Sequence, residues 1–508
     1  MQRSLAGNAA ILVASGFAVR MLGFVYRVYL SNLLGAEGMG LYQLISPVYL
    51  LAVLTITSGI SIAVSRLVSR EQALEQEYNA RRILWTSFFI GTALGTLAGL
   101  VMFLFPDFLS SAVISDPRAR DALRILAFCV PVVCMTTALK GYFYGSQKMT
   151  PNAVAQMVEQ GVRILTTGYL IQYLGGAGSG IPVSTACAYA MAGTVTGEMS
   201  SFLVVMGIYA FGRKRRSSPH SCSFTFGRRK AAYKVLGIAF PVSANRFVTS
   251  LMGTIETVMI PGRLQTGGLS INESMAAFGR FSGMSMPLIY FPAILTSALS
   301  TTLVPAIAEA VARGDLRRVN HRIDKSIRYT MATGILFSAF FLAFPHAIGN
   351  LAYPGENVGG SLQMLALCCV FMYLSQTLHG ILNGLGRQNQ LFWHALTGYG
   401  IRILAVWFLI PLRGMEAYAV SITISLGVTC ILNLRRAARD TGLSFNVRDW
   451  LIKPLPAGIA VIGVRVLAGL LPFWGQMRLE LAAAFVAIGF GIACLFAFGV
   501  IRRGRDFH

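Results

Sequence analysis

The chain has 508 residues, of which 55% are hydrophobic and only 12% are charged. Soluble globular proteins carry about 25% charged residues, so this composition excludes the soluble single-domain and multi-domain classes. Lysine and arginine outnumber the acidic residues by 43 to 20, a net charge of +23. In a membrane protein this excess marks the cytoplasmic loops, so we expect no nucleic-acid partner.

Apolar runs long enough to cross a bilayer recur along the whole sequence. A transmembrane helix needs about 20 predominantly apolar residues. The runs therefore predict an all-α integral membrane protein with about fourteen transmembrane helices. Their predicted bounds are 8–33, 41–66, 82–105, 122–145, 151–174, 181–211, 231–262, 276–309, 328–351, 361–384, 390–411, 415–435, 454–472 and 479–501.

The basic residues gather in alternate loops. Placing the N-terminus in the cytoplasm puts most of them on that side, including the groups within 213–234 and 313–328. By the positive-inside rule, both termini are then expected in the cytoplasm. The same loops are suited to contacting anionic lipid headgroups.

An internal repeat relates two halves of the sequence. A shift of 239 residues superposes Gly141 on Gly380 and Gly145 on Gly384, and the same register holds at other places. The shift spans six helices, so both halves face the membrane in the same direction, as in parallel-repeat transporters. We predict an N-terminal lobe at 1–211, a basic cytoplasmic linker at 212–230, a C-terminal lobe at 231–438 and two further helices within 452–503. Chance similarity of apolar sequence is the alternative.

Ionisable residues inside the spans are candidates for function, because a charge near the bilayer centre costs at least about 2.5–3.5 kcal/mol. Arg20 and Arg27 are seven residues apart and share one face of the first helix, with snorkelling to the headgroups as the alternative. Arg246 and Arg280 lie in the seventh and eighth helices, the repeat equivalents of the first two. A guanidinium can bind a diphosphate through paired hydrogen bonds, so these four arginines are the predicted substrate-binding residues. Glu256 is either an ion-coupling carboxylate or an arginine counter-ion.

The fifth helix carries a second candidate pair. Glu159 and Arg163 are four residues apart, which favours an ion pair along the helix. The pair either forms a polar seam within the protein or contacts the substrate. Arg402 is the repeat equivalent of Arg163 and belongs to the same set, whereas Glu198 and Arg465 receive no role.

Other patterns concern packing and exclude some chemistry. Gly91, Gly95 and Gly99 form a GxxxGxxxG face that predicts close helix packing on the third helix. The sequence has no GxxxxGK[ST] loop, no HExxH and no CxxC, so we expect no catalytic residues, no metal site and no cofactor. The energy for transport would come from an H⁺ or Na⁺ gradient, the membrane potential or consumption of the product.

Several segments resemble the stage V sporulation protein B group of the multidrug/oligosaccharidyl-lipid/polysaccharide (MOP) exporter superfamily, to which the MurJ-type lipid II flippases also belong. They are Arg20-Met21-Leu22-Gly23-Phe24, Leu34-Gly35-Ala36-Glu37-Gly38-Met39-Gly40-Leu41-Tyr42-Gln43, Ile62-Ala63-Val64-Ser65-Arg66, Lys140-Gly141-Tyr142-Phe143-Tyr144-Gly145 and Glu159-Gln160-Gly161-Val162-Arg163. The resemblance covers nearly the whole chain and is most specific over 15–165.

The resemblance implies a non-enzymatic flippase of the bacterial cytoplasmic membrane. Its expected substrate is an undecaprenyl-pyrophosphate-linked saccharide, such as a lipid II-like peptidoglycan precursor or a polysaccharide unit, and cell-wall synthesis enzymes are possible partners. It also implies a cationic central cavity to which arginines of the first and eighth helices contribute. Two alternatives stay open: a cation-coupled multidrug exporter of the same superfamily, which would need more acidic cavity residues, and a non-transporting scaffold in cell-wall synthesis.

Overall fold

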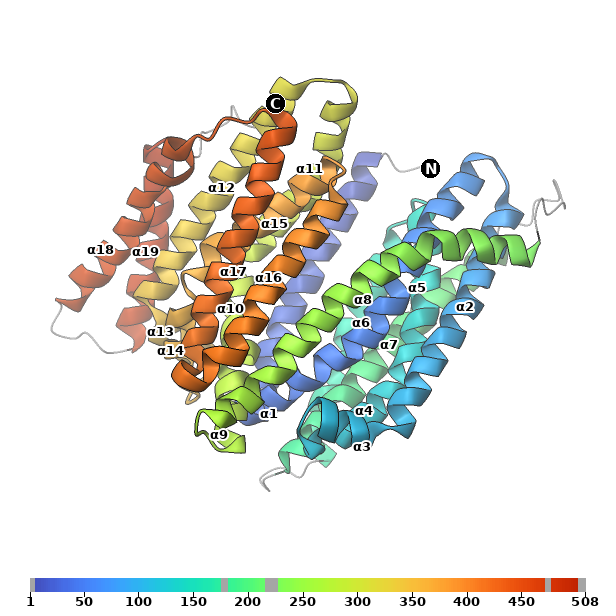
Figure 1. The fold of residues 1–508 in the computed structure, drawn as a ribbon, viewed down its shortest axis with the longest axis horizontal. Helices are drawn as coiled ribbons and strands as arrows, with labels where there is room; N and C mark the ends of the chain where they lie inside the picture. The colour runs from blue at the N-terminus through green and yellow to red at the C-terminus, as the bar shows by residue number, and fades with distance from the viewer. Residues whose placement is uncertain (1–4, 175–180, 215–226, 471–476, 501–508) are drawn as a thin grey trace. The chain divides into compact units, whose positions relative to one another are not determined.

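The computed structural model describes residues 5–174, 181–214, 227–470 and 477–500 (Figure 1). These residues form helices joined by short connections, and no strand occurs among them. Most of the predicted linker, 212–230, lies outside the described residues. The chain divides into two compact units, Met1–Val258 and Met259–His508, and the boundary falls inside one long helix, α8 (Arg228–Thr266).

The first unit begins with α1 (Leu5–Ala73), which contains two of the predicted spans. At Gly35 the backbone leaves the helix with φ 68° and ψ −179°, a conformation that favours glycine. The two spans therefore meet at a break of one residue. The remaining elements of this unit, before α8, are α2 (Glu77–Leu104), α3 (Pro106–Phe108), η1 (Leu109–Val113), η2 (Pro117–Ala119), α4 (Arg120–Ala127), α5 (Cys129–Gly145), α6 (Thr150–Tyr169), η3 (Leu170–Leu174) and α7 (Val183–Lys214).

After the end of α8, the first complete helix of the second unit is α9 (Ile271–Phe278), where Ser270 and Glu273 form a capping box. Hydrogen bonds donated by the Ser270 hydroxyl and backbone N–H lower the pKa of the Glu273 carboxyl. The remaining elements are η4 (Gly279–Ser285), α10 (Met286–Tyr290), α11 (Ala293–Ala312), α12 (Leu316–Ala343), α13 (Pro345–Ala352), α14 (Gly359–Leu365), α15 (Cys368–Gly384), α16 (Gln388–Phe408), α17 (Ile410–Thr441), η5 (Arg448–Ile452), α18 (Leu455–Gly469) and α19 (Met477–Ala497).

The helices account for the predicted spans. Among the described residues, nine helices are long and apolar enough to cross a membrane, and two bent pairs of helices bring the number to eleven. The break at Gly35 makes α1 two spans, and α6 and α16 are long enough to cross but less apolar. These three bring the total to fourteen. The prediction of an all-α membrane protein is therefore confirmed.

The 239-residue repeat is visible in the bounds of the helices. Shifting α2 (77–104) by 239 residues gives 316–343, the bounds of α12, and shifting α5 (129–145) gives 368–384, those of α15. The last residue of α1, Ala73, corresponds in the same way to Ala312 at the end of α11. The two units thus share one arrangement of helices at equivalent positions, which we call the helix frame. The spacing of the glycines in the sequence predicted it.

Small residues hold this frame together at equivalent positions. An added Cβ on Gly145 would lie 2.6 Å from the carbonyl oxygen of Ser65, and one on Gly384 would lie 3.0 Å from that of Val304, its equivalent. The predicted glycine face of α2 also packs closely, since a Cβ on Gly95 would lie 2.8 Å from the Cys134 sulfur of α5. Helix approach of this kind is available only to residues with little or no side chain.

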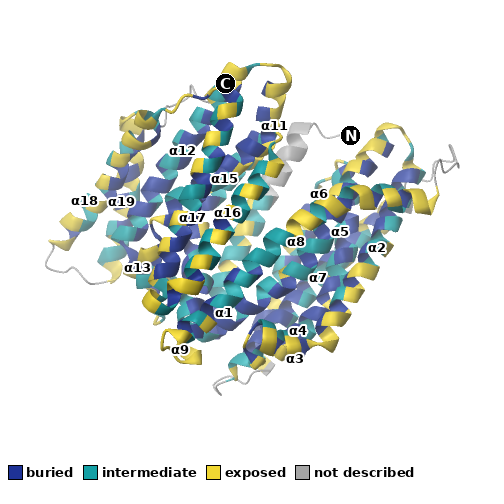
Figure 2. Ribbon diagram, in the orientation of Figure 1, coloured by how far each residue is buried: buried dark blue, intermediate teal, exposed yellow. Residues whose placement is uncertain are grey.

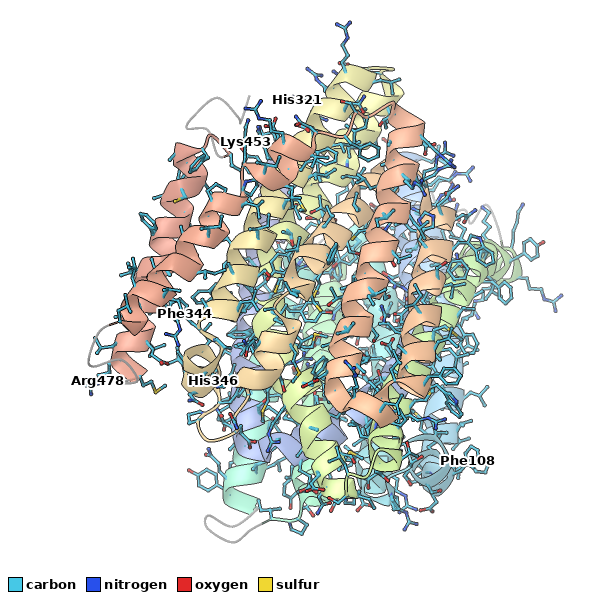
Figure 3. All side chains as sticks on the ribbon, turned by 60° about the vertical axis from the view of Figure 1, so that its left-hand side comes forward. Phe108, His321, Phe344, His346, Lys453 and Arg478 are labelled. Atoms are coloured by element: carbon cyan, nitrogen blue, oxygen red, sulfur yellow. The ribbon has the colours of Figure 1, made fainter. Side chains whose placement is uncertain are left out.

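Buried and exposed residues alternate along the helices (Figure 2). Both groups include many large apolar residues. Leucines such as Leu165, Leu203 and Leu467 are exposed on helices of membrane-spanning length, as expected where lipid is the solvent. In the second unit, α18 and α19 pack against α12 through a separate apolar cluster. Figure 3 shows His321 and Lys453 at one end of this unit and His346 and Arg478 at the other. The long helices of the unit therefore run from one of these ends to the other.

Candidate functional site

Four ionisable side chains meet inside the first unit, on three different helices. The Lys140 ammonium on α5 lies 3.5 Å from Oε2 of Glu159, and the Arg163 guanidinium lies 2.9 Å from Oε1 of the same carboxylate. The same Arg163 nitrogen lies 3.6 Å from Oε1 of Glu198 on α7. All four side chains are less than 20% exposed. We refer to Lys140, Glu159, Arg163 and Glu198 as the ion network.

The sequence brings these helices together for two reasons. Glu159 and Arg163 are four residues apart on α6 and therefore project from one face. On α7, an added Cβ at Gly197 would lie 2.9 Å from the Glu159 carbonyl oxygen, and one at Gly193 would lie 2.0 Å from the Thr167 hydroxyl. Both glycines let α7 approach α6 closely enough for Glu198 to reach Arg163.

Neutral polar groups surround the ion network. The Tyr26 hydroxyl on α1 lies 3.3 Å from the Thr167 hydroxyl on α6, and the Tyr49 hydroxyl lies 3.2 Å from the Cys129 sulfur. All four of these side chains are buried. Thr167 follows Arg163 by four residues on α6, so its contact with Tyr26 links α1 to the helix that carries half of the ion network.

The predicted phosphate-binding arginines occupy different surroundings. On the described part of α1, Arg20 is exposed and Arg27 is partly buried. Arg246 is exposed on α8, and Arg280 on η4 lies 3.9 Å from the Glu356 carboxylate. Arg20, Arg27 and Arg246 belong to the first unit and Arg280 to the second. The structure thus assigns Arg280 an acidic neighbour that the sequence pattern did not indicate.

The two remaining predicted residues lie on α8 and α16. Glu256 is 5% exposed on α8, two residues after Thr254, whose hydroxyl donates to the Pro47 carbonyl. Arg402 on α16 donates to the Ser425 hydroxyl at 2.9 Å, and its guanidinium lies 4.6 Å from the centre of the Tyr399 ring. The structure therefore holds Arg402, the repeat equivalent of Arg163, with a hydroxyl and an aromatic ring, which are neutral groups.

Sequence reasoning identified half of the ion network. It assigned Glu159 and Arg163, left Glu198 without a role and quoted Lys140 only within a family motif. The signal that could have found both is their charge, because each lies within a predicted membrane span. Arg465, the other unassigned charge, donates to the carbonyl of Ala343, the last residue of α12, and so stabilises a helix end.

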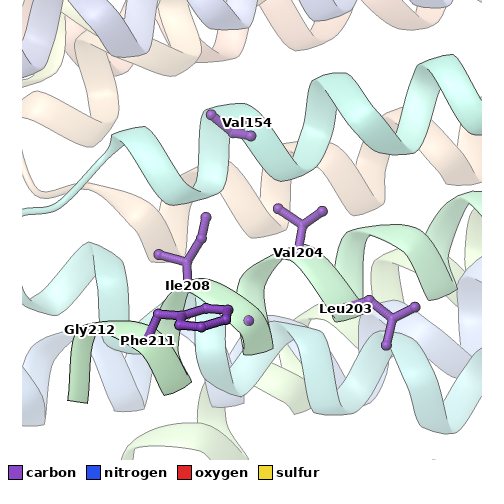
Figure 4. Close-up of a pocket in the computed structure, with 7 residues that line it drawn as sticks. Val154, Leu203, Val204, Ile208, Phe211 and Gly212 are labelled. Carbon is purple, nitrogen blue, oxygen red and sulfur yellow. The ribbon is translucent and has the colours of Figure 1, made fainter. Parts of the chain in front are cut away.

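An open apolar pocket of about 640 Å³ lies along α7 and is bordered by Val154 of α6 (Figure 4). Its lining carries no ionisable side chain, so it offers hydrocarbon contact and no site for a charged headgroup. The lining residues are Val154, Leu203, Val204, Gly207, Ile208, Phe211 and Gly212. Across the described residues, no three His, Cys, Asp or Glu side chains gather as a metal site would require.

Comparison with known proteins places the chain in a family. The sequence profile of the polysaccharide biosynthesis protein family matches residues 5–311, more than half of the chain. The chain belongs to this family. A second profile, MatE, matches residues 241–408. The family assignment covers all of the first unit that the structure describes, including the ion network.

Named relatives and a solved structure agree with this assignment. Stage V sporulation protein B of Bacillus subtilis (strain 168) is 24% identical over 446 residues, which cover 87% of this chain and 85% of that protein. The lipid II flippase MurJ of the same organism is 24% identical over 455 residues, covering 85% and 77%. A structure of lipid II flippase MurJ in an inward closed conformation aligns with a TM-score of 0.70 at 14% identity, covering 96% and 99%. This family member is a multi-pass, all-helical membrane protein with the fold of that structure.

Proposed function

We propose that this protein is a flippase that moves an undecaprenyl-pyrophosphate-linked saccharide across the bacterial cytoplasmic membrane. The observation that carries the proposal is the excess of arginine over carboxylate among the predicted site residues of a MOP-superfamily chain. A pyrophosphate headgroup is anionic, and arginine binds it through paired, charge-assisted hydrogen bonds. The similarity to a protein named as a lipid II flippase supports this substrate class.

The arginines have distinct parts in this mechanism. Arg20 and Arg27 are two helical turns apart on α1 and present two guanidinium groups along one face. Arg246 on α8 and Arg280 on η4 would add positive charge from the first helices of the second repeat. The two lobes would then expose the bound headgroup alternately to each side of the membrane.

The energy source and setting follow from the same proposal. A multi-pass protein with both termini in the cytoplasm matches the distribution of basic loops. An H⁺ or Na⁺ gradient or the membrane potential would drive transport, and cell-wall synthesis enzymes would consume the product. Anionic lipid headgroups would contact the basic loops.

A multidrug exporter is the second candidate function. The MatE profile over residues 241–408 favours it. An exporter of cationic drugs would use carboxylates, however, and Glu159 and Glu198, both less than 20% exposed, already contact Lys140 or Arg163. A non-transporting scaffold would have no use for arginines inside its spans, which carry an insertion cost.

Reconstitution with a labelled lipid-linked precursor tests the proposal directly. The purified full chain is placed in vesicles, and the precursor that reaches the other leaflet is scored with a membrane-impermeant reagent. Because a hydrogen bond to a charged group is worth about 1.5–3 kcal/mol, Arg20→Ala is expected to lower the transfer rate about 10- to 100-fold. Transfer of a cationic dye in place of the precursor would favour the exporter.

The matched control is Arg70→Ala, the same substitution on the same helix. Arg70 is exposed in the last turn of α1 and lies outside the predicted span. It is expected to leave transfer unchanged. Wild-type transfer rates in Arg20→Ala, with normal insertion of the protein, would refute a role for Arg20 in binding phosphate.

A further inference from the structure

The ion network contains equal numbers of positive and negative groups. Glu159 is contacted by both cations, Lys140 at 3.5 Å and Arg163 at 2.9 Å, while Glu198 is contacted by Arg163 at 3.6 Å. Because one Arg163 nitrogen contacts both carboxylates, Glu159 and Glu198 are adjacent. Arg163 can neutralise only one of two adjacent carboxylates. Lys140 therefore supplies the charge that balances the second.

The second unit lacks this arrangement at the equivalent positions. The 239-residue shift carries Lys140 to His379, Glu159 to Gly398 and Glu198 to Ala437. Only the arginine is kept, as Arg402. Both carboxylates and the lysine are therefore features of the first unit alone, and the shared helix frame does not require them.

We propose that Lys140 is a resident counter-ion, which fills the place that an exchangeable cation would otherwise take between Glu159 and Glu198. Carboxylate oxygens are the ligands that hard cations such as alkali and alkaline-earth ions prefer. The lysine ammonium carries the same single charge as Na⁺, but it is covalently tethered to α5. The network is thus neutral without any ion from solution.

This assignment has a consequence for a variant without the lysine. Breaking a buried ion pair leaves an uncompensated charge, which is strongly destabilising. In Lys140→Met the two carboxylates would face Arg163 alone, with one unbalanced negative charge and the space left by the ammonium. A soluble monovalent cation can fill that space and restore neutrality. The substitution therefore creates a cation site that the wild-type protein does not have.

The test measures thermal stability of the purified full chain against the cation in the buffer. NaCl is exchanged for N-methylglucamine chloride at constant ionic strength and mildly alkaline pH. We expect the wild-type melting temperature to be the same in both salts. We expect Lys140→Met to melt lower in N-methylglucamine and to recover with a saturable dependence on Na⁺, since a ligand that binds only the folded state stabilises it.

Three matched variants separate charge from packing. Lys140→Arg keeps the cation and is expected to behave like the wild type. Lys140→Met with Glu198→Gln removes one charge of each sign and is expected to lose the dependence on Na⁺. His379→Met makes the repeat-equivalent substitution in the second unit, where both carboxylate positions differ, and is expected to show no dependence.

Two results would overturn the proposal. A wild-type melting temperature that rises with Na⁺ would mean that an exchangeable cation already binds. A Lys140→Met variant that is indifferent to Na⁺ would mean that a proton shared between Glu159 and Glu198 balances the network. Both readouts concern stability, so they are independent of whether the protein transports the lipid-linked substrate.

Discussion

The α5–α6–α7 region of the first unit and the α15–α16–α17 region of the second share a helix frame but differ in charge. α5 and α15 have equivalent bounds, and their glycines pack against equivalent residues of α1 and α11. In the first unit these helices hold two carboxylates and two cations in contact. In the second, Arg402 contacts Ser425 and Tyr399.

The difference shows which residues specify the frame and which specify the chemistry. Close approach of helices depends on residues without side chains, such as Gly145 and Gly384, and these are kept at the repeat spacing. The ion network depends on residues that are not kept, Glu159 and Glu198 above all. The frame can therefore carry different polar sites in its two copies.

The largest expected effect on stability comes from removing Arg163, and the comparison is with Arg402, its repeat equivalent. Arg163→Leu leaves two largely buried carboxylates with one lysine, and we expect it to lower the free energy of unfolding by about 3–5 kcal/mol. Arg402→Leu removes a hydrogen bond to Ser425 and a contact with the Tyr399 ring, and we expect a loss of about 1–2 kcal/mol. Thermal or denaturant unfolding in detergent compares the two.

A charge-balanced variant checks the reason for this difference. Arg163→Leu combined with Glu198→Gln removes one cation and one carboxylate, so part of the lost stability is expected to return. Equal losses in Arg163→Leu and Arg402→Leu would contradict the contrast between the two units.

The sequence predicted the frame well because its signals are local or periodic. Apolar runs gave the spans, and the spacing from Gly141 to Gly380 gave the repeat register, which the bounds of α2 and α12 reproduce. The break at Gly35 was not predicted, because one glycine between two apolar runs resembles a loop. The orientation of the termini and the lobe boundaries remain predictions.

The site was less predictable, because its contacts join residues far apart in sequence. The spacing of Glu159 and Arg163 indicates a pair within one helix, but nothing local links either residue to Lys140 or Glu198. Arg465 illustrates the same limit, since its partner Ala343 is 122 residues away. A charge inside a span signals a partner, and only the fold identifies that partner.

The second prediction concerns the glycines that set the frame. Gly145→Ala would place a Cβ 2.6 Å from the Ser65 carbonyl oxygen, and Gly384→Ala would place one 2.9 Å from Ile307 Cβ. Overpacking of this kind typically costs 1–3 kcal/mol, and we expect both variants to lose stability, Gly145→Ala the more. Thermal unfolding of the full chain measures both.

The chain offers matched controls for these two substitutions. Gly161 on α6 and its repeat equivalent Gly400 on α16 have no atom within 4 Å of an added Cβ. Alanine is favoured over glycine in a helix by about 0.5–1 kcal/mol, so Gly161→Ala and Gly400→Ala are expected to be neutral or slightly stabilising. A loss of stability in these controls similar to that at Gly145 would show that close packing is not the cause.

The smallest expected effect concerns ion pairs. Each unit has one at a similar place, but the acidic and basic residues are exchanged between the two units. In the first unit Arg118 of η2 contacts Glu37 of α1 at 2.5 Å and Asp116 at 2.8 Å. In the second unit the basic residue is Arg280 of η4, and the acidic residue is Glu356 in the connection from α13 to α14, 3.9 Å away. In each unit the pair joins the start of a predicted membrane span to the connection between two later helices. These are α3 and α4 in the first unit and α13 and α14 in the second.

The geometry of the two pairs predicts unequal contributions. Arg118 is hydrogen-bonded to two carboxylates, one of them on the nearly buried Asp116, so we expect Arg118→Gln to cost about 1 kcal/mol. The Arg280 side chain is 40% exposed and its contact is long, so we expect Arg280→Gln to cost less than about 0.5 kcal/mol. Added salt should weaken the second pair more than the first, because exposed charges are screened more effectively. If Arg280→Gln proved the more damaging and the less salt-sensitive of the two, this ion pair would matter more to the second unit than its geometry indicates.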